Sequence, residues 1–180
     1  MTSRSSRQSR GTRVLIAVVT AVAALGVLVP AAGPAYAVTL VQCQGTETVT
    51  YDPGVTFTPH DVQLTVSGEF SSCVDGTGQA KSGTYGEQFT ISVGCNDLFD
   101  DFEGQRVVEW NAGDSSVIEG TGSSTAVAGQ VATTFTGTVV QGRFQGEPAV
   151  QTITLAQTQL LRCFTTGLTK ATGLTTLTIT

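Results

Sequence analysis

Residues 87–95 read EQFTISVGC, and in this stretch Phe89, Ile91, Val93 and Cys95 alternate with small or hydroxyl-bearing residues. Alternation with a period of two is typical of a β-strand that is buried on one face and solvated on the other. The stretch therefore predicts a central strand of an antiparallel β-protein, with Cys95 at the buried end of its apolar row.

The chain after residue 37 repeats this pattern, because short segments rich in Thr and Val are separated by Gly, Pro or Asp, and none has a helical period. Turns are expected at Asp52-Pro53-Gly54 and at residues 111–114. Strands are expected at residues 38–43, 47–51, 62–70, 87–95, 106–110, 116–118, 131–140, 150–156 and 174–180. This spacing favours an all-β antiparallel sandwich, immunoglobulin-like or jelly-roll-like, with a β-barrel as the alternative.

The first 37 residues are predicted to be a secretory signal peptide rather than part of the fold. An apolar run over residues 14–29 is followed by the small-residue cleavage site Ala35-Tyr36-Ala37, and the head before the run is basic, with Arg4, Arg7, Arg10 and Arg13. The mature protein is then expected to be one secreted domain, residues 38–180, that leaves the membrane once the signal is cleaved.

The charge of the mature domain excludes some classes of partner. Four of the nine basic residues lie in the signal and all fourteen acidic residues lie beyond it, which leaves residues 38–180 with a formal net charge of −9. A domain this acidic repels phosphate backbones and anionic lipids. Nucleic acids and membrane surfaces are therefore not expected to be partners, and an extracellular ligand or surface of unknown identity is.

All four cysteines lie in the exported part, as expected for two structural disulfides in an oxidising compartment. Cys95 ends one inward row, and Cys163 continues the apolar row of residues 153–161 if the register survives the intervening turn. Cys73 is out of phase with the row of residues 62–70, so we expect it at a strand end, where Cys43 could meet it. We therefore favour the pairs Cys95–Cys163 and Cys43–Cys73, although spacing alone leaves the other connectivities open.

The loop expected at residues 96–104 contains four carboxylates within seven positions, Asp97, Asp100, Asp101 and Glu103. Carboxylate oxygens are the ligands that Ca²⁺ prefers, although the spacing here matches no EF-hand loop. A calcium site is therefore one hypothesis for this loop, and a solvated acidic loop is the other. No other cofactor is expected, and Arg106 is the nearest basic residue in the sequence.

Signatures of catalysis are missing from the sequence. His60 is the only histidine and no G-x-S-x-G motif is present, so a serine-hydrolase triad is not predicted. Glu109 and Glu119 fall on one expected hairpin, but their parity is opposite to that of the apolar residues beside them, which places both carboxylates on the solvent face. We predict a non-enzymatic extracellular binding or structural module; the alternative is a small carbohydrate-binding or carbohydrate-hydrolysing domain.

Four segments carry a resemblance to a known group. They are GTETVTYDPG at residues 45–54, WNAG at residues 110–113, GTVVQGRFQG at residues 137–146 and LLRC at residues 160–163. In these segments the chain resembles uncharacterised secreted β-domain proteins of actinobacteria, whose function is unknown. The resemblance implies a secreted, disulfide-containing β-domain and implies no activity.

Overall fold

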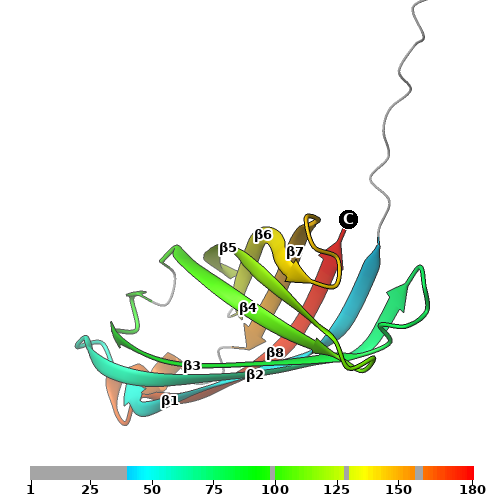
Figure 1. Cartoon of the computed structure of the whole chain (residues 1–180). Helices are drawn as coiled ribbons and strands as arrows, with labels where there is room; N and C mark the ends of the chain where they lie inside the picture. Colours follow the sequence, from blue (N-terminus) through cyan, green and yellow to red (C-terminus); the bar gives the residue numbers. More distant parts are fainter. Residues whose placement is uncertain (1–39, 98–99, 128–129, 157–159) are drawn as a thin grey trace, which may run out of the picture. The chain divides into compact units, whose positions relative to one another are not determined.

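The computed structural model describes residues 40–97, 100–127, 130–156 and 160–180, so the predicted signal peptide lies outside the described residues (Figure 1). The elements are β1 (Val41–Val55), β2 (His60–Asp75), β3 (Gly83–Val93), β4 (Phe102–Trp110), β5 (Ser115–Val127), β6 (Gln130–Gly142), β7 (Pro148–Ala156), the 3-10 helix η2 (Leu160–Phe164) and β8 (Leu168–Ile179). In these ranges, no helix is long and apolar enough to cross a membrane.

Each strand pairs antiparallel with the next one along the chain, and β8 pairs back onto β1, so the sheet closes into a barrel. The all-β class is confirmed, but the sandwich is wrong and the barrel alternative is correct. The reason lies in strand length, since β1 and β2 run for 15 and 16 residues. Strands this long let β1 pair over most of its length with both β2 and β8, which leaves no second sheet to stack.

The first two expected strands are one strand. β1 runs through Gly45, where the register against β2 shifts, and also through Asp52-Pro53-Gly54, which we had expected to be a turn. Glycine and proline mark bulges and bends inside strands as well as turns between them. Interpreting both as breaks shortened the predicted strands and so favoured a sandwich.

Both disulfides have the pairing that the sequence favoured, Cys43 with Cys73 and Cys95 with Cys163. The bulge explains the phase of Cys73, because Gln44 pairs with Ser72 while Gly45 pairs with Phe70, and the skipped residue reverses the alternation. Cys163 is buried as expected but for a different reason. It lies in η2 and not on a strand row, and the neighbouring Leu161, which we had placed in that row, is 81% exposed.

The barrel sheet is weakest between β3 and β4. These strands pair only at Gly83–Trp110 and Thr84–Glu109, whereas β3 pairs with β2 along its full length. Figure 1 shows the two strands diverging from that point. The acidic loop connects their separated ends, and its last residues, 102–104, belong to β4.

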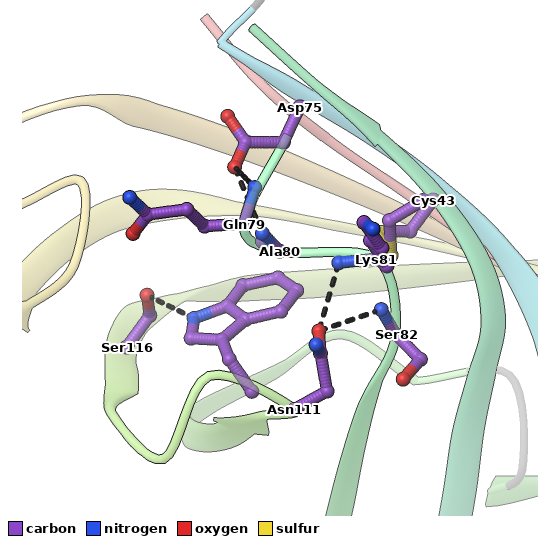
Figure 2. The surroundings of a disulfide bond; sticks show 10 residues. Cys43, Asp75, Gln79, Ala80, Lys81, Ser82, Asn111 and Ser116 are labelled. Atoms are coloured by element: carbon purple, nitrogen blue, oxygen red, sulfur yellow. Dashed lines mark hydrogen bonds between the residues drawn. A yellow bond between two sulfur atoms is a disulfide. The ribbon is translucent and has the colours of Figure 1, made fainter. Parts of the chain in front are cut away.

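The end of the barrel where β3 and β4 do pair is filled by side chains. The Trp110 indole N–H donates to the Ser116 hydroxyl over 2.9 Å, and the ring packs edge-on against Phe144. The side-chain oxygen of Asn111 accepts the backbone N–H groups of Lys81 and Ser82, close to the Cys43 disulfide (Figure 2). We call this the closed end.

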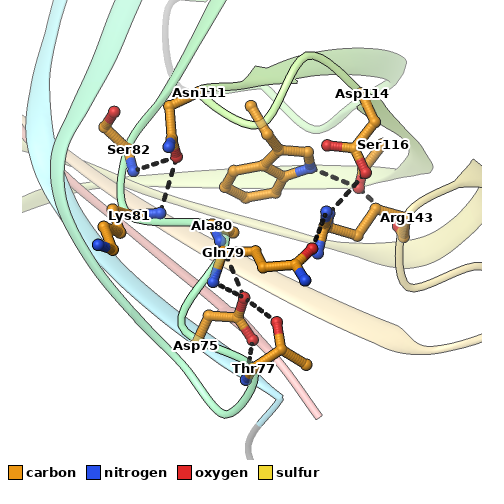
Figure 3. Close-up of polar contacts among 11 residues, drawn as sticks. Asp75, Thr77, Gln79, Ala80, Lys81, Ser82, Asn111, Asp114, Ser116 and Arg143 are labelled. Carbon is orange, nitrogen blue, oxygen red and sulfur yellow. Dashed lines mark hydrogen bonds and ion pairs between the residues drawn. The ribbon is translucent and has the colours of Figure 1, made fainter.

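The loop from Asp75 to Ser82 covers the closed end. The Asp75 carboxylate accepts the backbone N–H groups of Thr77, Gln79 and Ala80 (Figure 3). Partial burial alone would raise the pKa of Asp75, but these hydrogen bonds, together with the one from the Thr77 hydroxyl, hold it at about 2. Arg143, paired with Asp114 at 2.7 Å, also donates to the Gln79 side chain and ties the loop to the β6–β7 turn.

Candidate functional site

The other end of the barrel holds a cavity of about 790 Å³. The inward rows of the strands form its walls, which consist mainly of aliphatic and aromatic side chains: Val49, Tyr51, Leu64, Val66, Phe89, Ile91, Val93, Phe102, Val131, Ile153, Leu155, Leu168 and Ala171. An eight-stranded barrel is wide enough either to be filled by its own side chains or to hold one small ligand. The closed end is filled by its own side chains, and the opposite end leaves space for a small ligand.

The cavity changes the interpretation of the 87–95 stretch. Phe89 and Ile91 do point inward, yet each is 41% exposed, and Phe102 on β4 is 44% exposed. Their side chains face a chamber that opens where β3 and β4 diverge, and not a packed core. The alternation thus predicted the face of the strand correctly and its burial wrongly, because a period of two reports which way side chains point and not what fills the space opposite.

Arg106 lies at the base of the cavity, on the inward face of β4, with its side chain only 9% exposed. Its Nε donates to Glu87 over 2.8 Å, and its Nη1 donates to Gln151 over 2.7 Å and to Glu47 over 3.3 Å. The guanidinium carbon also lies 4.5 Å from the centre of the Tyr85 ring. One cation therefore joins side chains from β1, β3, β4 and β7.

Tyr85 completes this cluster from β3. Its hydroxyl donates to Glu47 over 2.6 Å and accepts the Gln151 side-chain amide over 2.9 Å, and that amide also donates to Thr175 on β8 over 2.8 Å. The Tyr85 ring occupies the space where a Cβ on Gly68, its partner on β2, would lie. A glycine at that position is what lets the ring lie flat against the sheet and place its hydroxyl on Glu47. We call Glu47, Tyr85, Glu87, Arg106, Gln151 and Thr175 the basal cluster.

Burial and charge act in opposite directions on these groups. Burial raises the pKa of the Glu47 carboxyl, and the nearby Arg106 and the Tyr85 hydroxyl offset only part of that rise. Burial lowers the pKa of Arg106, but the hydrogen bond and charge of Glu87 together with the charge of Glu47 outweigh it, so the pKa is raised and the guanidinium stays charged. Burial and the Glu47 charge raise the pKa of Tyr51, higher on the cavity wall, to about 12.

Two atoms of the cluster remain open towards the cavity. Oε1 of Glu47 and Nη2 of Arg106 have no hydrogen-bond partner among the described residues, since all contacts of Glu47 go through Oε2. Neither atom is sealed from solvent, because in the described part of the chain the only fully buried side-chain atom without a partner is Oδ1 of Asp114, at the closed end. Since both residues line the cavity, one acceptor and one donor face into it.

The four carboxylates singled out in the sequence also line the cavity, at its mouth. Arg106 is not their counter-ion, because its described partners are Glu47 and Glu87, and no ion pair among the described residues involves Asp97, Asp100, Asp101 or Glu103. Across residues 40–97, 100–127, 130–156 and 160–180, no group of three acidic, His or Cys side chains converges as metal ligands would. The calcium hypothesis stays a prediction, which melting curves in calcium and in chelator at matched ionic strength would test.

The other residues weighed from the sequence lie apart from the cavity. The His60 ring contacts the Thr58 carbonyl oxygen over 2.9 Å. Glu109 and Glu119 are both exposed on the outer face, as their parity predicted, and Glu119 accepts a hydrogen bond from Gln105. Trp110 is buried at the closed end. The structure therefore does not bring these residues together into a site.

Sequence reasoning missed the basal cluster, although a signal was present. Extended backwards from Phe89, the inward row of β3 reads Glu87, Tyr85 and Gly83, so a carboxylate and a hydroxyl lie on the face assigned to the core. On β7, Gln151 likewise lies between inward apolar residues and is 1% exposed. Polar side chains at inward positions indicate either buried networks or a ligand site.

Comparisons with protein-family models, with curated proteins and with solved structures found no match for this chain. The resemblance to secreted actinobacterial proteins therefore stays a prediction.

Proposed function

We propose that this protein is a secreted, non-enzymatic binding protein that holds a small molecule in the open end of its barrel. The observation that carries the proposal is the cavity of about 790 Å³ with mainly apolar walls and a buried polar cluster at its base. Small-molecule sites typically occupy about 300–1,000 Å³ and combine apolar walls with a few convergent polar groups. The two disulfides fit an oxidising, extracellular compartment.

The nature of the walls favours an apolar ligand over the carbohydrate alternative. Sugars carry hydroxyl groups along their whole length, and each one that is buried without a partner costs about 1–3 kcal/mol. The walls are built mainly from Val, Leu, Ile and Phe side chains, which offer no such partners. The two carboxylates at the base both accept hydrogen bonds from Arg106, which suits a structural or anchoring role better than catalysis.

Binding of a neutral fluorescent dye would test the proposal. N-phenyl-1-naphthylamine fluoresces strongly only in apolar surroundings, and we expect saturable binding with about one site per chain. Ile91→Trp should weaken the binding by partly filling the cavity. Val150→Trp is the matched control, because Val150 is also 41% exposed but lies on the outer face of β7. Absence of dye binding, or equal loss in both variants, would contradict the proposal.

A further inference from the structure

The charges around the cavity restrict what its ligand can be. The base holds two carboxylates and one guanidinium, which leaves one negative charge in excess when both carboxylates are ionised. Arg106 lies closer to Glu87, at 2.8 Å, than to Glu47, at 3.3 Å. The excess negative charge therefore falls on Glu47, whose Oε1 has no partner among the described residues and opens on the cavity.

A buried carboxylate is costly when only one of its two oxygens has partners, as in Glu47. Glu47 is only 4% exposed, and an ionised group removed from water needs an opposite charge or hydrogen-bond donors to compensate. One more positively charged donor at Oε1 would neutralise the base and complete the hydrogen bonding of the buried carboxylate. The base of the cavity can therefore take one cationic group. It offers no positive charge that would balance an anionic ligand.

The carboxylates at the mouth of the cavity also favour a positively charged ligand. Asp97, Asp100, Asp101 and Glu103 line it without an ion pair to any described residue. Clefts with charges of one sign focus the field, which attracts ligands of the opposite sign and slows ligands of the same sign. An anionic ligand would have to pass these groups, and although it could accept a hydrogen bond from the open Nη2 of Arg106, it would place a third negative charge beside a single guanidinium.

We propose that the ligand is an apolar molecule with a single cationic, hydrogen-donating head group such as a primary amine, which binds to Oε1 of Glu47 while its body packs against the aliphatic walls. This inference rests on the proposed function of the cavity. A charge-assisted hydrogen bond to a buried carboxylate is roughly twice as strong as a neutral one, so the head group selects among molecules whose apolar bodies are the same.

Three competitors with one alkyl chain and different head groups would test the inference. Octylamine, 1-octanol and octanoate are each titrated against the bound N-phenyl-1-naphthylamine at pH 8 and low ionic strength. We expect octylamine to compete at least about tenfold better than octanoate, which corresponds to about 1.4 kcal/mol. The advantage should shrink as salt is added, because the exposed carboxylates at the mouth are screened.

Variants then locate the head group. Glu47→Gln should lower the affinity for octylamine about tenfold and leave that for 1-octanol nearly unchanged. Glu87→Gln, at a side chain that is 24% exposed and so tolerates change more readily, should reduce the octylamine advantage even if Glu47→Gln folds poorly. Glu109→Gln is the matched control, since it removes the same charge from the outer face of β4 and should change nothing.

The outcomes separate this inference from the function on which it rests. If octanoate or 1-octanol competes as well as octylamine while the dye binds normally, the head-group inference is wrong and the binding function stands. The same conclusion follows if Glu109→Gln weakens octylamine as much as Glu47→Gln and Glu87→Gln do. If neither the dye nor any of the three competitors binds, the proposed function fails and the inference fails with it.

Discussion

Replacing Arg106 with methionine should destabilise the protein strongly, because the guanidinium is the only basic group in contact with Glu47 among the described residues. Methionine fills a similar volume, so the change removes charge and hydrogen bonds without opening a large gap. Glu47 would remain 4% exposed with no cation, and breaking a buried ion pair in this way costs roughly 3–5 kcal/mol. At about 3 °C per kcal/mol for a domain of this size, the melting temperature should fall by about 9–15 °C.

A second substitution should recover most of that loss. In Arg106→Met combined with Glu47→Gln, the buried position carries no charge, and the glutamine oxygen can still accept the Tyr85 hydroxyl that now bonds to Glu47. Glu87 keeps partial access to water, with 24% of its side chain exposed. We therefore expect the double variant to be about 2–3 kcal/mol more stable than the single Arg106→Met variant, as replacement of buried ion pairs by neutral groups generally allows.

The pH dependence follows from the pKa of Glu47, which burial already raises and which Arg106 partly lowers. Without Arg106 this pKa rises further above the unfolded value of about 4.3. A carboxyl group with a raised pKa binds its proton more tightly when folded, so the penalty is greatest at high pH and disappears as the pH falls below both values. Thermal melts of the single variant, the double variant and the wild type from pH 8 to pH 4 measure how the loss of stability depends on pH.

Two results would refute this account of the basal cluster. One is an Arg106→Met variant that melts within about 3 °C of the wild type at pH 8, a shift worth only about 1 kcal/mol. The other is a double variant that is no more stable than the single one. Either result would mean that Glu47 is already neutral or hydrated in the folded protein.

Three further predictions concern the disulfides, the closed end and the mouth. Replacing Cys95 and Cys163 by alanine should cost about 4 kcal/mol, slightly more than loss of the other bridge, because the separation is 68 residues against 30; urea denaturation with each pair replaced compares them. The Asp75 pKa of about 2 lies below the unfolded value of about 3.9, so its stabilising effect is complete above about pH 4 and is lost as the pH falls towards 2. Asp75→Asn should flatten acid denaturation in that window, and an unchanged profile would contradict the role of the loop hydrogen bonds. Gly122→Ala should weaken dye binding, because the Phe102 ring occupies the space that the new methyl group needs.

Local pattern was enough to predict where most strands lie and which of their faces point inward, but not where the strands end. Phe89, Ile91 and Val93 point inward as their alternation predicted, and the hairpin after Trp110 turns where expected. The Cys43–Cys73 pair was also accessible, since both cysteines lie near strand ends. Cys95 and Cys163 lie outside the strands, so their pairing was predicted correctly but for the wrong reason. The inward faces, the hairpin and the Cys43–Cys73 pair follow from residues close in sequence or from a simple parity rule. They are therefore the same in a sandwich and in a barrel.

Closure of the sheet, unlike the faces of the strands, cannot be predicted from local sequence patterns. It depends on β8 pairing with β1, a contact between residues such as Val41 and Ile179 at opposite ends of the domain. No local rule reports such a pairing, because a strand with an apolar face looks the same whether it faces a second sheet or the far wall of a barrel. The sequence therefore predicted an all-β fold but favoured the wrong way of burying its apolar faces.

The basal cluster depends on the same long-range pairing. Glu47 and Thr175 lie near the start and the end of the domain, and both bond to the Tyr85 hydroxyl because β1 and β8 are neighbours in the closed barrel. The individual outliers, such as Glu87 in an apolar row, could be read from the sequence. Their convergence on Arg106 could not, because Arg106 looked like the nearest cation to the acidic loop until the register of β4 turned it inward.

The division of the barrel into two ends has an energetic logic. An unfilled cavity forfeits the packing that a solid core would supply, and cavity-forming changes in cores typically cost about 2–5 kcal/mol each. At the closed end, Trp110, the disulfide between Cys43 and Cys73 and the hydrogen bonds of Asp75 supply compensating stability. None of the residues that form those three contacts lines the cavity. Because these contacts lie apart from the cavity, the aliphatic walls can be adapted to a ligand while the closed end keeps the fold stable, whereas the basal cluster, through Arg106, contributes both to stability and to the chamber.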